Sequence, residues 1–371
     1  PFMMKAASIT ILILSLILPA GAHGFSEPDA ANLSAGLNLR VPATAPDASD
    51  GKSARAEAQH NAMRWYPRQK DTNWEGVALV IHGLNCRPDK MEAIIGKLNA
   101  NGIDCLNLSL RGHGANFSPI HNTSNEKARM TALKLVSYPL WKTEAYAAYQ
   151  FAKKRSYLYE KPLFLIGFSM GGLLGIDLIA SNPNVNFEKM VLFAPAIAMH
   201  PRNYLIKILS PFPGLVIPSA GHASYLANEG TPMAAYNAFF EMHAHFENHL
   251  DPKKINIPTV IFIDEDDELV SYTSLQKMVR LQYLDQWKIH PVKKDNAATE
   301  VKMHHLIIDA ASVGKVMWQE MVDVTITHLL NRQSLILQNK GQFEKCAQGA
   351  PVKLFIHYAG LPQVIKTGLM K

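Results

Sequence analysis

The feature that most constrains this 371-residue chain is a serine enclosed by glycines, Gly167-Phe168-Ser169-Met170-Gly171. An apolar run at 162–166 precedes it and a second one at 172–176 follows it, so a buried strand should turn directly into a helix here. So tight a turn needs small residues two before and two after the serine, because larger side chains would collide with the neighbouring strand or helix. The segment predicts a nucleophile elbow, which holds a serine hydroxyl out into a cleft; a glycine-rich connection with a buried serine is the alternative.

Apolar runs before and after this turn repeat with the rhythm of a parallel sheet covered by helices. The runs predict strands at 77–81, 104–110, 163–166, 190–193 and 259–263, and helices around 88–100, 141–154, 170–181 and 311–330. Hydrophobic residues make up 48% of the chain and charged residues 18%, which excludes a mainly disordered protein and allows a large core. We expect an α/β fold with a mostly parallel, doubly wound sheet.

The N-terminal region predicts export. Lys5, the apolar residues 6–18 and the small residues Ala20 and Ala22 predict a signal peptide at 1–22, which places the mature protein in the periplasm or outside the cell. The apolar run is shorter than the ~20 residues that a membrane-spanning helix needs, although a retained N-terminal anchor is the alternative. Residues 23–60, rich in Ala, Ser, Pro, Asp and Gly, predict a flexible leader.

The remaining chain is expected to divide around one long insertion. Residues 61–198 and 259–331 should form the two parts of the α/β core, and residues 199–258 are too many for a simple connection, so they predict a cap. The proline-punctuated stretch 204–217 is rich in bulky apolar residues, which bind an acyl chain or only pack the cap onto the core. Residues 332–371 form a C-terminal extension of unknown role.

Charge and cysteine content exclude several classes of function. The formal net charge of +6 comes from scattered lysines and arginines without a dense basic block, so we expect no nucleic-acid partner, although contact with anionic membrane lipids stays open. Cys86, Cys105 and Cys346 are odd in number and widely spaced, which argues against a disulfide framework and a cysteine zinc site.

A serine hydroxyl becomes a nucleophile only beside a histidine base that a carboxylate orients. Several carboxylates compete in the turn 264–268, directly after the last predicted strand, and the stretch 301–309 offers His304 and His305. An oxyanion also needs backbone amides: those of Met170, after the serine, and Leu84, in the loop after strand 77–81, are the candidates.

Taken in order, these motifs resemble a known family. His82-Gly83, Arg111-Gly112-His113-Gly114, the glycine-flanked Ser169, Asp267 and His304 are similar to the α/β-hydrolase superfamily, in its monoacylglycerol lipase-like and serine aminopeptidase-like branch, over residues 65–330. The resemblance implies an α/β-hydrolase fold with an inserted cap and a triad of Ser169, Asp267 and His304. His304 is preferred because relatives often carry an acidic residue five positions after the histidine, and Asp309 stands at that distance from His304. His305 is the alternative base.

The resemblance also implies an activity. Members of this branch usually cleave carboxylic esters of lipophilic molecules such as monoacylglycerols or lysophospholipids, through an acyl-enzyme and without a cofactor. An aminopeptidase-like hydrolase, or a noncatalytic protein that binds apolar ligands on the same scaffold, is the alternative. The chain departs from the family at Ser109, where many relatives carry aspartate, and at Asp264, where glycine is common.

One group of histidines in the predicted cap raises the question of a metal. His245 and His249 have the one-turn spacing of zinc-binding pairs, with His243 close by, but Phe246 follows His245 where the metalloprotease pattern needs glutamate. No third ligand is evident. We therefore expect no metal and no cofactor.

Overall fold

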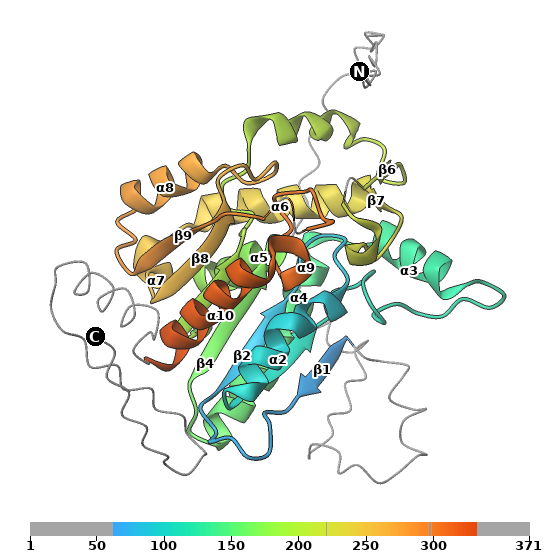
Figure 1. Ribbon diagram of the computed structural model, residues 1–371. Coiled ribbons are helices and arrows are strands. Elements are labelled where there is room, and N and C mark those ends of the chain that lie inside the picture. The colour runs from blue at the N-terminus through green and yellow to red at the C-terminus, as the bar shows by residue number, and fades with distance from the viewer. Residues whose placement is uncertain (1–61, 220, 296, 298, 332–371) are drawn as a thin grey trace, which may run out of the picture. The chain divides into compact units, whose positions relative to one another are not determined.

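The computed structural model describes residues 62–219, 221–295, 297 and 299–331, and within them a seven-stranded sheet forms the centre of the fold. The strand order is β1-β3-β2-β4-β5-β8-β9, with β1 antiparallel to β3 and all other neighbours parallel (Figure 1). The strands are β1 (Met63–Tyr66), β2 (Gly76–Ile81), β3 (Ile103–Leu108), β4 (Leu163–Phe168), β5 (Lys189–Phe193), β8 (Thr259–Asp264) and β9 (Trp287–Val292). The predicted α/β fold with a mostly parallel sheet is confirmed.

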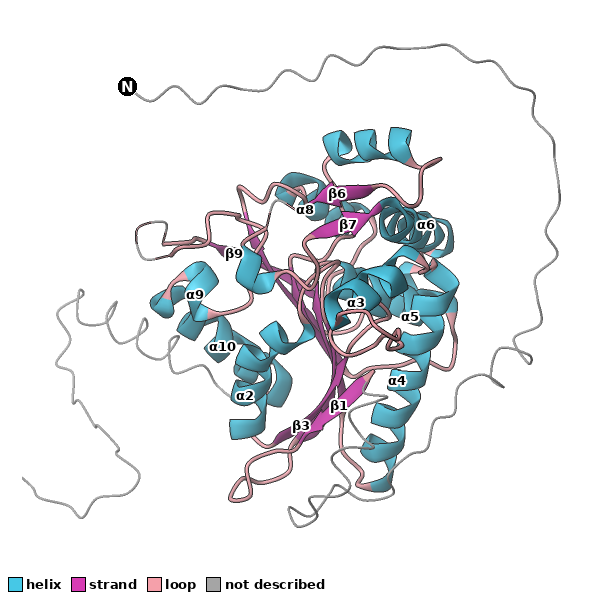
Figure 2. Ribbon diagram, turned by 90° about the vertical axis from the view of Figure 1, so that its right-hand side faces the viewer, coloured by secondary structure: helices cyan, strands magenta, loops and turns pink. Residues whose placement is uncertain are grey.

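Helices cover both faces of this sheet, as Figure 2 shows edge-on. On one face lie η2 (Pro88–Met91), α2 (Glu92–Ala100), α9 (Ala310–Val313) and α10 (Lys315–Leu330); on the other lie α4 (Tyr138–Leu158), α5 (Met170–Ser181) and α8 (Tyr272–Leu281). Alternate residues of β2 join the two hydrophobic cores: Val77, Leu79 and Ile81 join one, and Ala78 and Val80 join the other. Because every residue of β2 is buried, its sequence is a continuous apolar run.

A long segment between β5 and β8 lies over the carboxyl edge of the sheet, with α3 (Asn125–Lys134) beside it (Figure 1). The segment contains η3 (Pro201–Leu209), β6 (Val216–Pro218), η4 (Ala223–Tyr225), β7 (Gly230–Pro232), α6 (Met233–His249) and α7 (Pro252–Ile255), and β6 pairs with β7. Helix α6 packs on α5 and buries Met242 and Phe246 in the same core as the sheet. The division at 199 and 258 into core and cap stays a prediction of the sequence.

The predicted signal peptide, leader and C-terminal extension, and with them Cys346, lie outside the described residues. Cys86 and Cys105 are free and buried. Within the part of the chain that the structure describes, no helix has both the length and the apolar character to cross a membrane.

Candidate active site

Ser169 stands at the turn between β4 and α5 in a strained conformation. Its φ of 51° and ψ of −116° are unfavourable for a residue with a side chain, and they are held by the elements on either side. A Cβ on Gly171 would lie 2.2 Å from the Ile81 carbonyl oxygen, and one on Gly167 would lie 2.6 Å from the Gly172 Cα. Both flanking glycines are therefore required by close approach, which is the reason that the sequence pattern predicts this turn.

The structure brings together a serine, a histidine and an aspartate from three distant parts of the chain. His305 Nε2 lies 2.8 Å from Ser169 Oγ, and His305 Nδ1 lies 2.8 Å from Asp267 Oδ2. All three residues are buried, with exposed fractions of 8% for Ser169, 4% for His305 and 2% for Asp267. This hydrogen-bonded chain has the connectivity of a catalytic triad, with a base beside a hydroxyl and a carboxylate behind the base.

The prediction that His304, rather than His305, lies beside Ser169 as the base is wrong. His304 Nδ1 instead lies 3.0 Å from Asp264 Oδ2. Both oxygens of the Glu268 carboxylate accept hydrogen bonds from the backbone amides of His304 and His305, which fixes this loop with only His305 directed at Ser169.

The acidic residue used to choose between the two histidines has another role. Asp309 caps α9 through the Ser312 amide, and its carboxylate accepts a hydrogen bond from the Tyr225 hydroxyl. Its spacing from His304 therefore reflects a helix start beside the loop, and it does not report which imidazole faces the serine.

Asp267 is held as a carboxylate. Burial raises its pKa, but the His305 imidazole and the backbone amides of Val270 and Leu269 outweigh burial, and the pKa lies below its ordinary value. Both amides donate to Oδ1 at 2.8 Å. The charge of Asp267 is therefore available to orient and stabilise a protonated His305.

Two buried histidines hold the loop that carries the predicted Leu84 amide. His82 Nε2 accepts from the Leu110 amide and its Nδ1 donates to the Gly83 carbonyl, while His113 Nε2 accepts from the Asn85 amide. Burial lowers the pKa of His82 to about 4 and lowers that of His113 as well, so both imidazoles are neutral and able to accept.

The amides of Leu84 and Met170 donate to no other residue in the described part of the chain. Met170 is the first residue of α5, where a helix leaves its amides without internal partners and presents a partial positive charge. Both amides are thus free to donate to a negatively charged oxygen of a bound molecule.

The three histidines of the insertion do not converge on a common point. His245 Nδ1 bonds the buried carboxylate of Asp177 at 2.7 Å, and His249 Nδ1 faces the His245 carbonyl oxygen. His243 lies beside Glu247 and the Tyr204 hydroxyl. His245 and His243 therefore connect α6 to Asp177 of α5 and Tyr204 of η3, whereas His249 bonds within its own helix.

The described residues line an open cavity of about 1230 Å³ away from the triad. It lies between α3, the edge of the sheet at β1 and β3, and residues 223–229, and its lining includes neither Ser169 nor His305.

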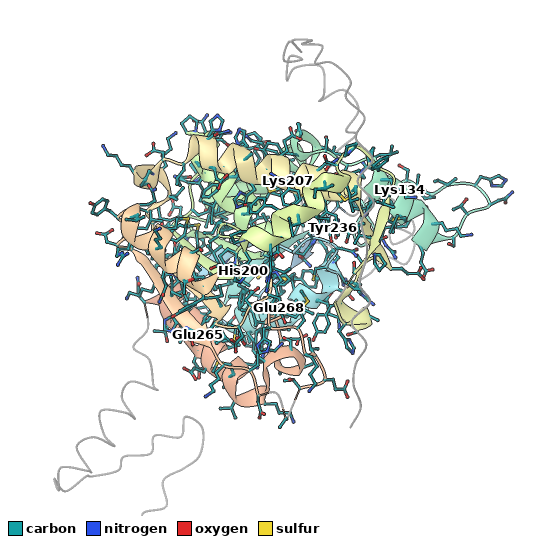
Figure 3. The ribbon with its side chains drawn as sticks, turned by 90° about the horizontal axis from the view of Figure 1, so that it is seen from above. Lys134, His200, Lys207, Tyr236, Glu265 and Glu268 are labelled. Carbon is teal, nitrogen blue, oxygen red and sulfur yellow. The ribbon has the colours of Figure 1, made fainter. Side chains whose placement is uncertain are left out.

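The apolar stretch predicted to contact an acyl chain has two kinds of residue. Tyr204 and Ile206 pack on the core, whereas Leu205, Ile208 and Phe212 are more than 60% exposed. Figure 3 views the molecule from above and labels His200, Lys207 and Tyr236 of the segment between β5 and β8, and Glu268 of the turn after β8.

Comparison with known proteins agrees with this architecture. A family model described as serine aminopeptidase matches residues 72–233. A structure reported for LipS and LipT, two metagenome-derived lipolytic enzymes, is 17% identical with a TM-score of 0.54, covering 74% of this chain and 99% of that one. A soluble variant of monoglyceride lipase from Saccharomyces cerevisiae is 15% identical with a TM-score of 0.55, covering 72% and 91%. No curated protein matches the chain. At identities this low, the similarity of these structures establishes a shared fold and no more.

Proposed function

Because the chain belongs to the α/β-hydrolase superfamily, in its monoacylglycerol lipase-like and serine aminopeptidase-like branch, we propose that it is a serine hydrolase that cleaves carboxylic esters. The observation that carries this proposal is the hydrogen-bonded chain from Ser169 Oγ through His305 to Asp267. In the proposed reaction His305 takes the serine proton as Oγ attacks the ester carbonyl, and it then gives that proton to the departing alcohol. Water, activated by the same imidazole, releases the acid from the acyl-enzyme.

The tetrahedral intermediates carry a negative oxygen that needs fixed donors. The Met170 and Leu84 amides supply them in this proposal, and such donors are typically worth about 3–4 kcal/mol of the barrier each. Asp267 remains ionised throughout and stabilises the imidazolium that His305 becomes. No cofactor enters any of these steps.

A lipophilic ester, such as a monoacylglycerol or a lysophospholipid, is the proposed substrate class. The apolar side chains of η3 and the following turn support it, since Leu205, Ile208 and Phe212 offer exposed apolar surface. The same surface, with Lys207 among these residues, supports peripheral contact with membrane lipids. Export to the periplasm or the extracellular space, by way of the N-terminal segment, is also proposed, and the mass of the mature N-terminal peptide tests it.

An aminopeptidase is the second candidate, because that activity names the matching family model. It must hold a substrate ammonium with carboxylates near Ser169. The acids of the insertion are poorly suited: Glu229, Glu241 and Glu247 are exposed, Glu229 lines the cavity away from the triad, and Glu247 pairs with His243. Esters are therefore favoured over peptides.

The test is turnover of nitrophenyl butyrate, nitrophenyl octanoate and a monoacylglycerol by the purified chain, with aminoacyl nitroanilides in parallel. Ser169→Ala should lower ester turnover by roughly 10³–10⁶-fold, while Ser181→Ala, a matched serine at the other end of α5, should retain it. Labelling of Ser169 by a fluorophosphonate separates a hydrolase from a noncatalytic binding protein. Ester turnover that survives Ser169→Ala would contradict the proposal.

A further inference from the structure

Three side chains lie beside the triad without taking part in it. One ligand atom each from Asp264, Asp266 and His304, two carboxylate oxygens and one imidazole nitrogen, all lie within 4.8 Å of one another. Ligand bonds of about 2.0–2.2 Å to a single ion place neighbouring ligand atoms roughly 3–4.4 Å apart. The 3.0 Å between His304 Nδ1 and Asp264 Oδ2 lies in this range. The 4.8 Å limit for the whole cluster exceeds it by a few tenths of an ångström, which a small shift of the exposed Asp266 side chain would close.

The two buried atoms of the cluster lack hydrogen bonds. Asp264 is 4% exposed, and its Oδ1 accepts from the Asp266 amide. Its Oδ2 and the His304 Nδ1 find no hydrogen-bond partner among the described residues, although they face each other at 3.0 Å. Buried polar atoms are nearly always satisfied, so this pair calls either for a proton on Nδ1 that makes an ion pair with Oδ2, or for a cation that both atoms contact.

The charged neighbours are already committed elsewhere. Lys294 is buried close by, and its ammonium uses its full capacity of three donors on backbone carbonyls, those of Val301, Met303 and Leu306. Both oxygens of Glu268 accept from the amides of the histidine loop. Lys294 therefore does not donate to Asp264 Oδ2, and Glu268 does not accept from His304 Nδ1.

We propose that Asp264, Asp266 and His304 bind one Zn²⁺ ion, with water completing its coordination. An imidazole nitrogen combined with carboxylates suits zinc, whereas Mg²⁺ and Ca²⁺ prefer sites made of oxygen alone. Asp266 is exposed, which gives the ion a route of entry. The proposal departs from the expectation of a metal-free protein, and it gives a role to Asp264, which stands where relatives commonly carry glycine.

The bound ion joins two loops that the triad depends on. Asp266 precedes Asp267 in the turn after β8, and His304 precedes His305 in the histidine loop. A cation ligated from both sides holds these loops together and stabilises the folded chain against the unfolded one. The proposal does not rest on the proposed hydrolase activity, because its measurements are binding and unfolding.

Calorimetric titration of the EDTA-treated, dialysed full chain with ZnCl₂ tests the proposal. We expect one Zn²⁺ per chain and an unfolding midpoint raised by roughly 5–10 °C when free Zn²⁺ is about a hundredfold above its Kd. Asp264→Asn, Asp266→Asn and His304→Ala should each weaken binding at least ~10-fold. Asp266 is exposed, so its variant should fold even where a buried substitution does not.

Two matched controls should bind as the unmodified chain does. Glu265→Gln removes a neighbouring acid of the same turn, labelled in Figure 3, and His249→Ala removes a histidine of the other group. The proposal would be overturned if the chain did not bind zinc, or if it bound Mg²⁺ or Ca²⁺ more tightly than Zn²⁺. It would also be overturned if Asp266→Asn and His304→Ala bound zinc as tightly as the unmodified chain does.

Discussion

At the scale of single residues, two adjacent histidines have opposite expected importance. His305→Ala removes the group that bonds both Ser169 and Asp267, so kcat for ester hydrolysis should fall by about 10⁴-fold or more. His304→Ala leaves that hydrogen-bonded chain intact and should cost far less. Steady-state kinetics of both variants in the same zinc-containing buffer check the difference. An equal loss of kcat in the two variants would contradict the assignment of His305, rather than His304, as the base.

Sequence reasoning named Ser169 and Asp267, which the structure places in one hydrogen-bonded chain, but it preferred His304 where the structure has His305. The glycines around Ser169 are dictated by close backbone approach, which any sequence with this turn must respect. Nothing comparable separates His304 from His305, because the direction of each side chain depends on Glu268, whose contacts with the loop span 36 and 37 residues. A local pattern does not contain such a contact.

The elbow makes a second residue-scale prediction. Gly171→Ala places a methyl group 2.2 Å from the Ile81 carbonyl oxygen, and neither backbone segment moves without disturbing the sheet or α5. We expect a loss of about 2–4 kcal/mol in the free energy of unfolding. Gly96→Ala in α2, where an added Cβ meets nothing within 4 Å, is the matched control and should be neutral or stabilising. Urea denaturation measures both, and equal midpoints would contradict this reading of the turn.

At the scale of elements, the sequence predicted the central strands and missed those at the edges. Strands β2, β4, β5 and β8 each contain an apolar run of four or more residues, and β3 is interrupted only by Asp104 and Asn107. In contrast, β1 contains Arg64 and β9 contains Lys288, His290 and Pro291. Strands at a sheet edge tolerate charge and proline because one side of the ladder is unpaired. Helix α8 was missed although Leu275, Met278 and Val279 recur at helical spacing and pack on the core, with only Leu275 fully buried.

The attachment of α6 is testable at this scale. Phe246 is 1% exposed and lies in the core that α5 shares with the sheet, so Phe246→Ala should cost about 3–5 kcal/mol by leaving a cavity beneath the helix. Asn248→Ala, at an exposed position of the same helix, should change stability by less than about 0.5 kcal/mol. The comparison uses unfolding midpoints, and a Phe246 variant as stable as the Asn248 variant would mean that α6 does not depend on this contact.

At the scale of the whole molecule, buried imidazoles make stability depend on acidity. Burial lowers the pKa of His82 and of His328 to about 4, and it lowers that of His113 as well. In the unfolded chain a histidine has a pKa of about 6.5, so between pH 6.5 and 4 the unfolded state binds more protons than the folded state. Stability is therefore complete above about pH 6.5 and is lost as the pH falls towards 4. Asp267, whose pKa is lowered, loses its own contribution only below the ordinary aspartate range.

His82 is the group whose share of this loss is best isolated. It is fully buried, and a difference of about 2.5 pKa units corresponds to roughly 3 kcal/mol lost between pH 7 and pH 4. His82→Asn should lower stability at pH 7, because two backbone contacts change, but it should flatten the dependence on pH. Burial raises the pKa of Glu144, which opposes the trend, yet Glu144 is present in both proteins and cancels in the comparison. Urea unfolding at pH 7, 6, 5 and 4 gives both slopes, and parallel curves would show that His82 is not the neutral group that the loop requires.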